Sequence, residues 1–168
     1  MKRTVVLIRH AKSSWADTAQ DDLKRPLNDR GEHDAPLMGE HLKKIKLKPD
    51  LIITSPAKRA KQTANKIAKE LNYDKDKIAE EEKLYLCAPS TFEEVISDLK
   101  GEVETVFIVG HNPGITEFVN ELSDDFKTDN MPTCAIAGVQ VNIPEWKDFG
   151  AAKKDVFVYE YPKKFYEH

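Results

Sequence analysis

The sequence has only two cysteines in 168 residues, Cys87 and Cys134, which lie far apart and form no C-x-x-C pair. Such sparse cysteines argue against a disulfide framework and a cysteine zinc site, so we interpret both as buried or unreactive thiols. The sequence also lacks an H-E-x-x-H pair, ligand-spaced acidic clusters and a G-x-x-x-x-G-K-[ST] loop. We therefore expect no metal and no cofactor.

An excess of charge of one sign is also absent. The 26 basic and 29 acidic side chains are mixed along the chain and give a formal net charge of -3, so no long-range field favours nucleic acid or an anionic membrane. The opening apolar run is too short for a signal-peptide core, and no later segment approaches a membrane span. We expect a cytoplasmic monomer that binds neither nucleic acid nor membranes.

The pattern of apolar runs predicts one α/β domain over residues 1–168, since no repeat or flexible linker divides the chain. Continuous β-branched apolar runs predict buried parallel strands at 4–8, 50–55 and 105–110. A weaker strand is predicted within 77–84, and an antiparallel pair at 134–143 and 155–162. Helices are predicted at 29–46, at 56–71, at 91–100 with Ser90 as N-cap, and from Pro113 onward.

This alternation predicts a three-layer sandwich, a mostly parallel central sheet with helices on both faces and an antiparallel C-terminal edge. Ligands of such sheets bind beyond the carboxyl ends of the strands. Arg9 and His10 stand at that end of the first strand, and His111 follows the third with Asn112 as a candidate cap. In "IITSPAKRAKQTA" Ser55 is the expected N-cap and Pro56 the first helical residue, which places Arg59 in the opening turn.

Two arginines and two histidines from three segments are therefore expected to converge at one edge of the sheet. The planar guanidinium group of arginine has N–H donors spaced to match the oxygens of a phosphoryl group. A neutral imidazole is a nucleophile that can accept that group and later release it to water. Taken alone, Arg9 and His10 are better explained as surface charge at a strand end. Arg59 alone could be one more cation of a basic helix, and His111 alone a neighbour of a helix cap. The coincidence of all three favours a phosphate pocket with His10 in a chemical role.

The motifs "RHAKSSW" (9–15), "RPLNDRG" (25–31), "SPAKRAKQTA" (55–64) and "GHNPG" (110–114) resemble those of the histidine phosphatase superfamily, the phosphoglycerate-mutase-like fold, and most of all its SixA-type phosphohistidine phosphatase branch. The resemblance implies that His10 becomes phosphorylated while Arg9, Arg59 and His111 form the phosphate pocket. It also implies that Arg25 is an added phosphate or substrate contact, with an ordinary loop arginine as the alternative. Ser13 is either a hydroxyl near the phosphate or a turn former.

Two departures from the family pattern bear on the prediction. Ala11 stands where many members have glycine, so the turn after His10 must use backbone angles open to a residue with a Cβ. No general acid can be placed: Glu82 and Glu93 lie in the broadly right region, among acids that read as a solvated face. An alkoxide is a poor leaving group, whereas the nitrogen of phosphohistidine leaves readily once it is protonated. Phosphohistidine is therefore the substrate that least needs an acid from the enzyme.

The function predicted is a metal-independent phosphatase that forms a phosphohistidine intermediate and acts on protein phosphohistidine. A phosphatase for a small phosphoester is the alternative within the same class, and a non-catalytic phosphate or phosphoprotein-binding module is the alternative of another class. Four further histidine and tryptophan residues are expected to have no role in the reaction. We expect His33 and His41 to be solvent-facing or half-buried on a helix, and Trp15 and Trp146 to be packing residues.

Overall fold

The computed structural model describes residues 1–166, which contain one six-stranded sheet in the order β3-β2-β4-β1-β5-β6. Neighbours among β1 to β4 pair in parallel, whereas β5 runs antiparallel to β1 and β6 antiparallel to β5. The mostly parallel sheet with an antiparallel C-terminal edge is thus confirmed. The strands are β1 (Lys2–Arg9), β2 (Leu51–Thr54), β3 (Ala79–Glu80), β4 (Thr105–Gly110), β5 (Ile136–Asn142) and β6 (Lys154–Glu160).

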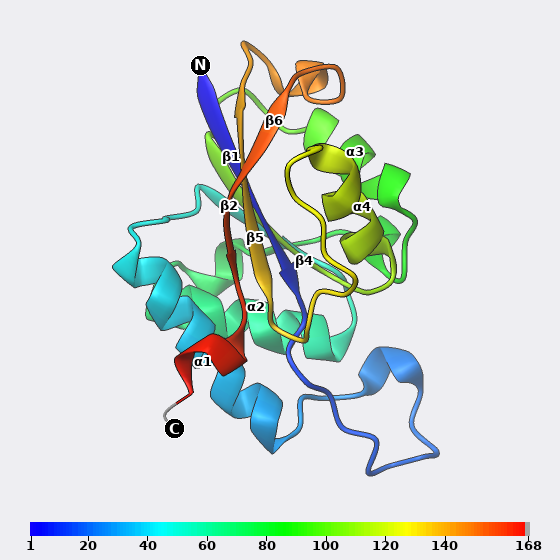
Figure 1. The fold of residues 1–168 in the computed structure, drawn as a ribbon. Coiled ribbons are helices and arrows are strands. Elements are labelled where there is room, and N and C mark those ends of the chain that lie inside the picture. Colours follow the sequence, from blue (N-terminus) through cyan, green and yellow to red (C-terminus); the bar gives the residue numbers. More distant parts are fainter. Residues whose placement is uncertain (167–168) are drawn as a thin grey trace.

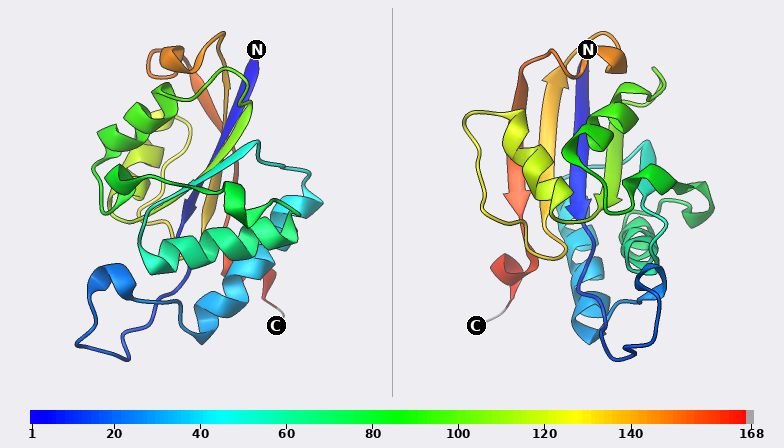
Figure 2. Two further views of the ribbon diagram at one scale, coloured as in Figure 1. Left: turned by 180° about the vertical axis from the view of Figure 1, so that it is seen from behind. Right: turned by 90° about the vertical axis from the view of Figure 1, so that its right-hand side faces the viewer.

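Helices cover both faces of the sheet, as the sequence predicts (Figures 1 and 2). One core packs α1 and α2 against one face through residues such as Ile8 and Ile67, and a second packs α3 and α4 against the other through Leu7 and Phe118. The helices are α1 (Asp29–Lys44), α2 (Lys58–Glu70), α3 (Pro89–Ser97) and α4 (Gly114–Leu122). Short 3-10 turns are η1 (Asp22–Lys24), η2 (Lys75–Lys77), η3 (Glu82–Leu84), η4 (Trp146–Asp148) and η5 (Pro162–Phe165).

Element boundaries differ from the sequence prediction at several positions. Helix α4 begins at Gly114 with Pro113 at the N-cap position, so Asn112 is not its cap. The weak strand within 77–84 is only β3, two residues long, and 3-10 turns flank it on both sides. Helix α3 begins at Pro89, whose fixed φ suits a first helical position, so Ser90 lies inside the first turn instead of capping it. Helix α2 begins at Lys58 after Ala57, which frees Ser55 for a different partner.

The carboxyl ends of β1, β2 and β4 meet at one edge of the sheet. Arg9 pairs with Gly110 at the last position of the β1 to β4 register. The first amide after β1 and the first amide after β2 each extend the pairing of their strand with β4, since His10 N donates to Gly110 O at 3.1 Å and Ser55 N donates to Val109 O at 3.1 Å. Beyond this edge the chain between β1 and α1 extends away from the sheet (Figure 1). The three predicted segments therefore end together.

Both cysteines fit the expected unreactive role. Cys87 is half-buried and Cys134 is buried, and neither takes part in a disulfide within residues 1–166. Burial raises the pKa of the Cys87 thiol to about 11 and raises the pKa of Cys134 as well, so neither forms a thiolate near neutral pH. In the described part of the chain, every helix is too short or too polar to cross a membrane.

The first turn of α1 packs tightly against the loop that follows β1. The Asn28 side chain caps α1 by accepting from Gly31 N at 2.9 Å, and Asn28 N donates to Lys12 O at 3.0 Å. A Cβ added at Gly31 would collide with the carbonyl oxygen of Lys12. Gly31 is therefore the residue that lets α1 approach the loop.

We expect Gly31→Ala to lower the free energy of unfolding by about 1 to 3 kcal/mol, because overpacking forces the loop or the helix to move. Gly101→Ala is the matched control, since a Cβ at Gly101 meets open space. Urea unfolding of both variants and the native protein measures the difference. Equal stability of the two variants would show that the loop after β1 yields freely.

Candidate active site

His10 lies at the end of β1 with only 7% of its surface exposed. Its Nδ1 is 2.8 Å from the carbonyl oxygen of Ala11. A carbonyl oxygen can only accept, so Nδ1 carries the proton and Nε2 keeps a free lone pair. Burial lowers the pKa of His10 to about 3, and although the Ala11 carbonyl opposes this, the positive charges of Arg59 and Arg9 add to it. The ring is neutral and nucleophilic at neutral pH.

His111 follows β4, and the centroid of its ring is 5.1 Å from that of His10. Its Nε2 lies 2.7 Å from Ser55 Oγ, which itself accepts from the Ala57 amide at 3.2 Å. On the other side of the ring, Arg59 Nη2 lies 3.5 Å from Nδ1, and because a guanidinium group can only donate, the His111 ring is held between Arg59 and the Ser55 hydroxyl. Burial, followed by the charge of Arg59, lowers the pKa of His111 to about 4. Ser55 supports this histidine and does not act as the expected N-cap of α2.

The two predicted arginines reach the same place. Arg59 lies in the opening turn of α2 and is 2% exposed, and Arg9 donates from Nη1 to Met131 O at 2.8 Å. Within residues 1–166, the buried Nε atoms of Arg9 and Arg59 have no hydrogen-bond partner. Buried donors are costly when unpaired, and the oxygens of an anion would satisfy them.

Asp22, in η1, is a site residue that the sequence interpretation missed. Its Oδ2 accepts from Arg59 Nη2 at 2.9 Å and also from the Tyr85 hydroxyl, while its Oδ1 accepts from Arg25 Nε at 3.0 Å. Partial burial alone would raise the pKa of Asp22, but the hydrogen bonds from Tyr85, Arg25 and Arg59 lower it far below its usual range. The one available signal was an acid three residues before Arg25.

Arg25 and Ser13 are brought together at this site. Arg25 is 6% exposed and its Nη1 donates to Ser13 Oγ at 2.5 Å. The Arg25 guanidinium also lies over the ring of Trp15, 3.6 Å from the ring centroid. Trp15 is 68% exposed, so the expectation that it is a packing residue is wrong, because its ring stacks on a loop arginine instead of entering the core. The same expectation is confirmed for Trp146, which is 1% exposed.

Two polar residues of the "SPAKRAKQTA" block hold the loops that carry the site. The Thr63 hydroxyl donates to Arg59 O at 2.8 Å and accepts from the amide of Ala11 at 3.0 Å. Gln62 Oε1 accepts from Leu27 N at 2.8 Å. Ala11 is fully buried, and its φ is not among the positive values of the described chain, so the turn after His10 tolerates a Cβ. The motif sequence by itself predicts no role for Gln62 or Thr63.

The groups described above line one pocket of about 260 Å³. Glu82 and Glu93 are both exposed and lie outside its lining, while His33 is exposed and His41 half-buried on α1, as expected. Among residues 1–166, no group of three or more His, Cys, Asp or Glu side chains is placed to hold a metal ion. The lining consists of Arg9, His10, Lys12, Ser13, Trp15, Asp22, Arg25, Arg59, Leu86, His111, Asn112 and Thr133.

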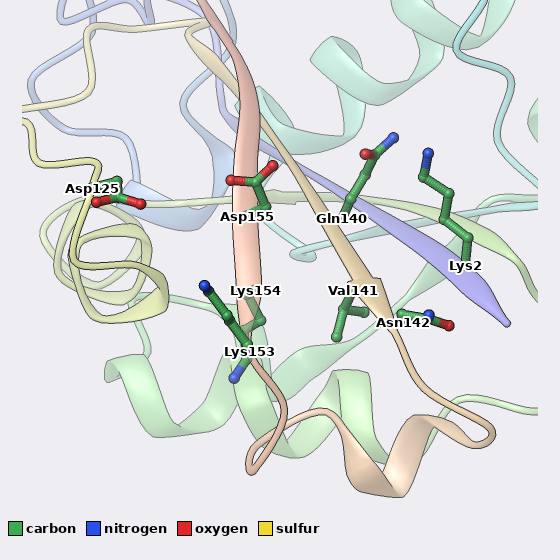
Figure 3. Close-up of a pocket in the computed structure, with 8 residues that line it drawn as sticks. All are labelled: Lys2, Asp125, Gln140, Val141, Asn142, Lys153, Lys154 and Asp155. Carbon is green, nitrogen blue, oxygen red and sulfur yellow. The ribbon is translucent and has the colours of Figure 1, made fainter.

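A larger pocket of about 420 Å³ lies elsewhere, along the start of β1, the end of β5 and the start of β6 (Figure 3). Its lining includes Lys2, at the end of β1 opposite Arg9. Lysines and aspartates are mixed in it, and it contains none of the residues singled out by the sequence motifs. The smaller pocket, with its convergent cations and perturbed histidines, is the candidate active site.

The two buried histidines make stability depend on pH. Their folded pKa values, about 3 for His10 and about 4 for His111, lie below the ordinary value of 6.5. Between those values and 6.5 the unfolded chain binds more protons than the folded protein, so stability is full above pH 6.5 and falls as pH decreases. The lowered pKa of Asp22 acts only near and below its unfolded value of 3.8, so the histidines alone set the change in stability between pH 7 and pH 5.

We expect the free energy of unfolding to fall by on the order of 2 to 4 kcal/mol between pH 7 and pH 5. Each of the two histidine rings contributes at most about 1.4 kcal/mol per pH unit. Replacing both histidines, His10→Gln with His111→Gln, should remove most of this slope. His33→Gln is the control, because His33 is exposed. Urea titrations at the two pH values test this, and an unchanged slope in the double variant would contradict it.

The motif-bearing residues have counterparts in known proteins. The model of the histidine phosphatase superfamily (branch 1) matches residues 5–102, which include Arg9, His10 and Arg59. A solved structure described as the protein histidine phosphatase SixA complexed with tungstate is 25% identical, with a TM-score of 0.80 over 97% of this chain and 99% of that one. A candidate phosphohistidine phosphatase SixA from Agrobacterium tumefaciens is 25% identical, with a TM-score of 0.82 over 95% and 98%.

A curated relative shows the same likeness along most of its length. An uncharacterised protein of Mycobacterium tuberculosis is 32% identical over 152 residues, which are 84% of this chain and 90% of that protein. Together these matches support phosphatase activity for this chain. The chain belongs to the histidine phosphatase superfamily.

Proposed function

We propose that this protein is a phosphatase for protein phosphohistidine and that its own His10 carries the phosphoryl group during turnover. The observation that carries the choice of substrate is the state of Asp22. Among the described residues, Asp22 is the single carboxyl group that lines the pocket, and its hydrogen bonds hold it ionised. A solved neighbour described as a protein histidine phosphatase supports the same choice.

In the first step, Nε2 of His10 attacks the phosphorus atom of the substrate. The bond between phosphorus and the substrate imidazole nitrogen breaks, and its electron pair stays on that nitrogen, which takes a proton from water. The proton on Nδ1 of His10 is held by the Ala11 carbonyl at 2.8 Å, which fixes the ring with Nε2 as the nucleophile.

In the second step, water attacks the phosphorus atom now bound to Nε2. The bond between phosphorus and Nε2 breaks, its electron pair returns to the ring, and the attacking water gives its proton to solvent. The products are inorganic phosphate and neutral His10. The low pKa of His10, about 3, means that the returning ring needs no deprotonation before the next cycle.

The surrounding donors stabilise charge on the transferring oxygens. Arg9 and Arg59 supply fixed positive charge, and His111, whose Nδ1 lies 3.5 Å from Arg59 Nη2, lines the pocket beside them. Arg25, held by Ser13 and Asp22, extends the positive lining toward the mouth of the pocket and contacts the phosphoryl group or the substrate beside it. We assign Ser13 the task of orienting Arg25.

Phosphohistidine and a phosphoester differ as substrates in the ease with which their leaving groups depart. An alkoxide is a poor leaving group unless an acid protonates it, and Glu82 and Glu93 lie outside the pocket while Asp22 is ionised. The imidazole nitrogen of phosphohistidine departs readily once solvent protonates it. A small aryl phosphate remains the second candidate substrate class, because its leaving group also departs without an enzyme acid.

A non-catalytic phosphate-binding module would have the same arginines without need of a nucleophile. The fixed tautomer of His10 and its depressed pKa favour catalysis, because binding alone would benefit from a protonated ring. Turnover of either phosphohistidine or an aryl phosphate by the purified protein rules out the binding module.

His10→Ala should abolish hydrolysis of a phosphohistidine peptide, because the nucleophile is removed. With radiolabelled substrate and rapid alkaline quenching, the native protein should carry a label that is stable to base and lost in acid. His33→Ala is the matched control, an exposed histidine outside the pocket, and should keep both label and turnover. A label that persists in His10→Ala would contradict the assignment.

The rate should depend strongly on leaving-group pKa across a series of phosphoesters, with activated aryl phosphates reacting well and alkyl phosphates poorly. This follows from the lack of a protonated acid among the lining residues, since general acids typically contribute about 100- to 10,000-fold. Values of kcat/KM, measured beside a phosphohistidine peptide, test it. A flat series that collapses in Glu82→Gln or Glu93→Gln would favour the small-phosphoester function.

A further inference from the structure

Two exposed apolar side chains stand at the mouth of the phosphate pocket. Trp15 is 68% exposed and Leu86 is 54% exposed, and both belong to the pocket lining. Leu23, 42% exposed, follows Asp22 directly in η1. Three of the six large apolar side chains exposed in residues 1–166 thus lie at or beside this site. Scattered exposed apolar residues are ordinary, but a gathering of them at a pocket for anions marks a contact surface.

Trp15 is held in a defined orientation although most of its surface is open. The guanidinium of Arg25 lies 3.6 Å from the centroid of its ring. Arg25 is itself fixed, since it donates to Ser13 Oγ at 2.5 Å and to Asp22 Oδ1 at 3.0 Å. A ring oriented in advance loses little conformational entropy on binding, which is the property of an aromatic anchor at an interface.

Leu86 is held outward by its backbone. Its φ of 49° lies in the left-handed region, which is unfavourable for leucine. The residues on either side are anchored, because the Tyr85 hydroxyl donates to Asp22 and the Cys87 carbonyl packs against Gly114 so closely that a Cβ there would collide with it. Strained backbone of this kind persists where the neighbouring structure imposes it, and such sites cluster where ligands bind.

We propose that Trp15 and Leu86 bind apolar side chains that flank the phosphorylated residue of a polypeptide substrate, an inference that rests on the proposed function. His10 is only 7% exposed, so the phosphorylated side chain must enter the pocket while the chain that carries it stays at the mouth. There it meets the ring of Trp15 and the side chain of Leu86. A small phosphoester without an apolar substituent has nothing to place on either side chain.

Two stable peptides test the proposal, each with a non-hydrolysable phosphohistidine analogue, one flanked by leucines and the other by serines. The native protein should bind the leucine-flanked peptide about tenfold more tightly, the ratio expected from partial burial of one or two apolar side chains. Tryptophan fluorescence reports the contact directly. Trp15 is exposed and Trp146 is 1% exposed, so only the leucine-flanked peptide should shift the emission to the blue.

Trp15→Ala and Leu86→Ala should each bring the affinity ratio toward one. Phe157→Ala is the matched control, because Phe157 is 38% exposed on β6 and outside the pocket, and it should keep the ratio. Equal binding of both peptides by the native protein, or an unchanged ratio in both rim variants, overturns the proposal.

Turnover separates this proposal from the proposed function. Hydrolysis of phosphohistidine with equal binding of the two peptides overturns the role of Trp15 and Leu86 alone. Preference for the leucine-flanked peptide without any hydrolysis supports that role and overturns the proposed function alone.

Discussion

Parallel pairing of β1 with β4, with Arg9 opposite Gly110, sets the geometry on which the whole site depends. Because the strands end together, the residues that follow them, His10 and His111, have ring centroids only 5.1 Å apart. A shift of this register by one residue would turn each buried side chain of a strand to the other face of the sheet. The two apolar cores, one on each face, prevent that shift. The packing of the core thus fixes the position of His10, the proposed nucleophile.

The site is electrostatically organised around one carboxylate. Asp22 accepts from Arg59, Arg25 and Tyr85, and these bonds connect the loop after β1 with α2 and with the turn before α3. Such an arrangement holds both guanidinium groups at the pocket before any anion binds, so little reorganisation is needed. The same contacts keep the carboxyl group ionised and unfit to donate a proton. Preorganisation for phosphate and the leaving-group preference that we propose would have one physical origin.

Buried histidines connect this chemistry with stability. Removal of His10 and His111 from water keeps both rings neutral at neutral pH, which is the state that the proposed mechanism requires of His10. The same burial makes the folded protein less stable wherever the unfolded chain would protonate them. Function and acid sensitivity therefore arise from the same desolvation.

The sequence by itself determined the α/β sandwich, the three strand ends and the four residues Arg9, His10, Arg59 and His111, because apolar periodicity and short-range motifs are written locally. Only the tertiary structure decided what depends on contacts between distant segments. Ser55 looked like a helix cap and proved to bind His111 across 56 positions, and Asp22 became the partner of Arg59 across 37. The large aromatic side chain of Trp15 suggested a packing residue. The loop that carries Trp15 instead leaves it exposed and places its ring against Arg25. Side-chain partners at such separations follow from how the strands and helices pack, which no local pattern encodes.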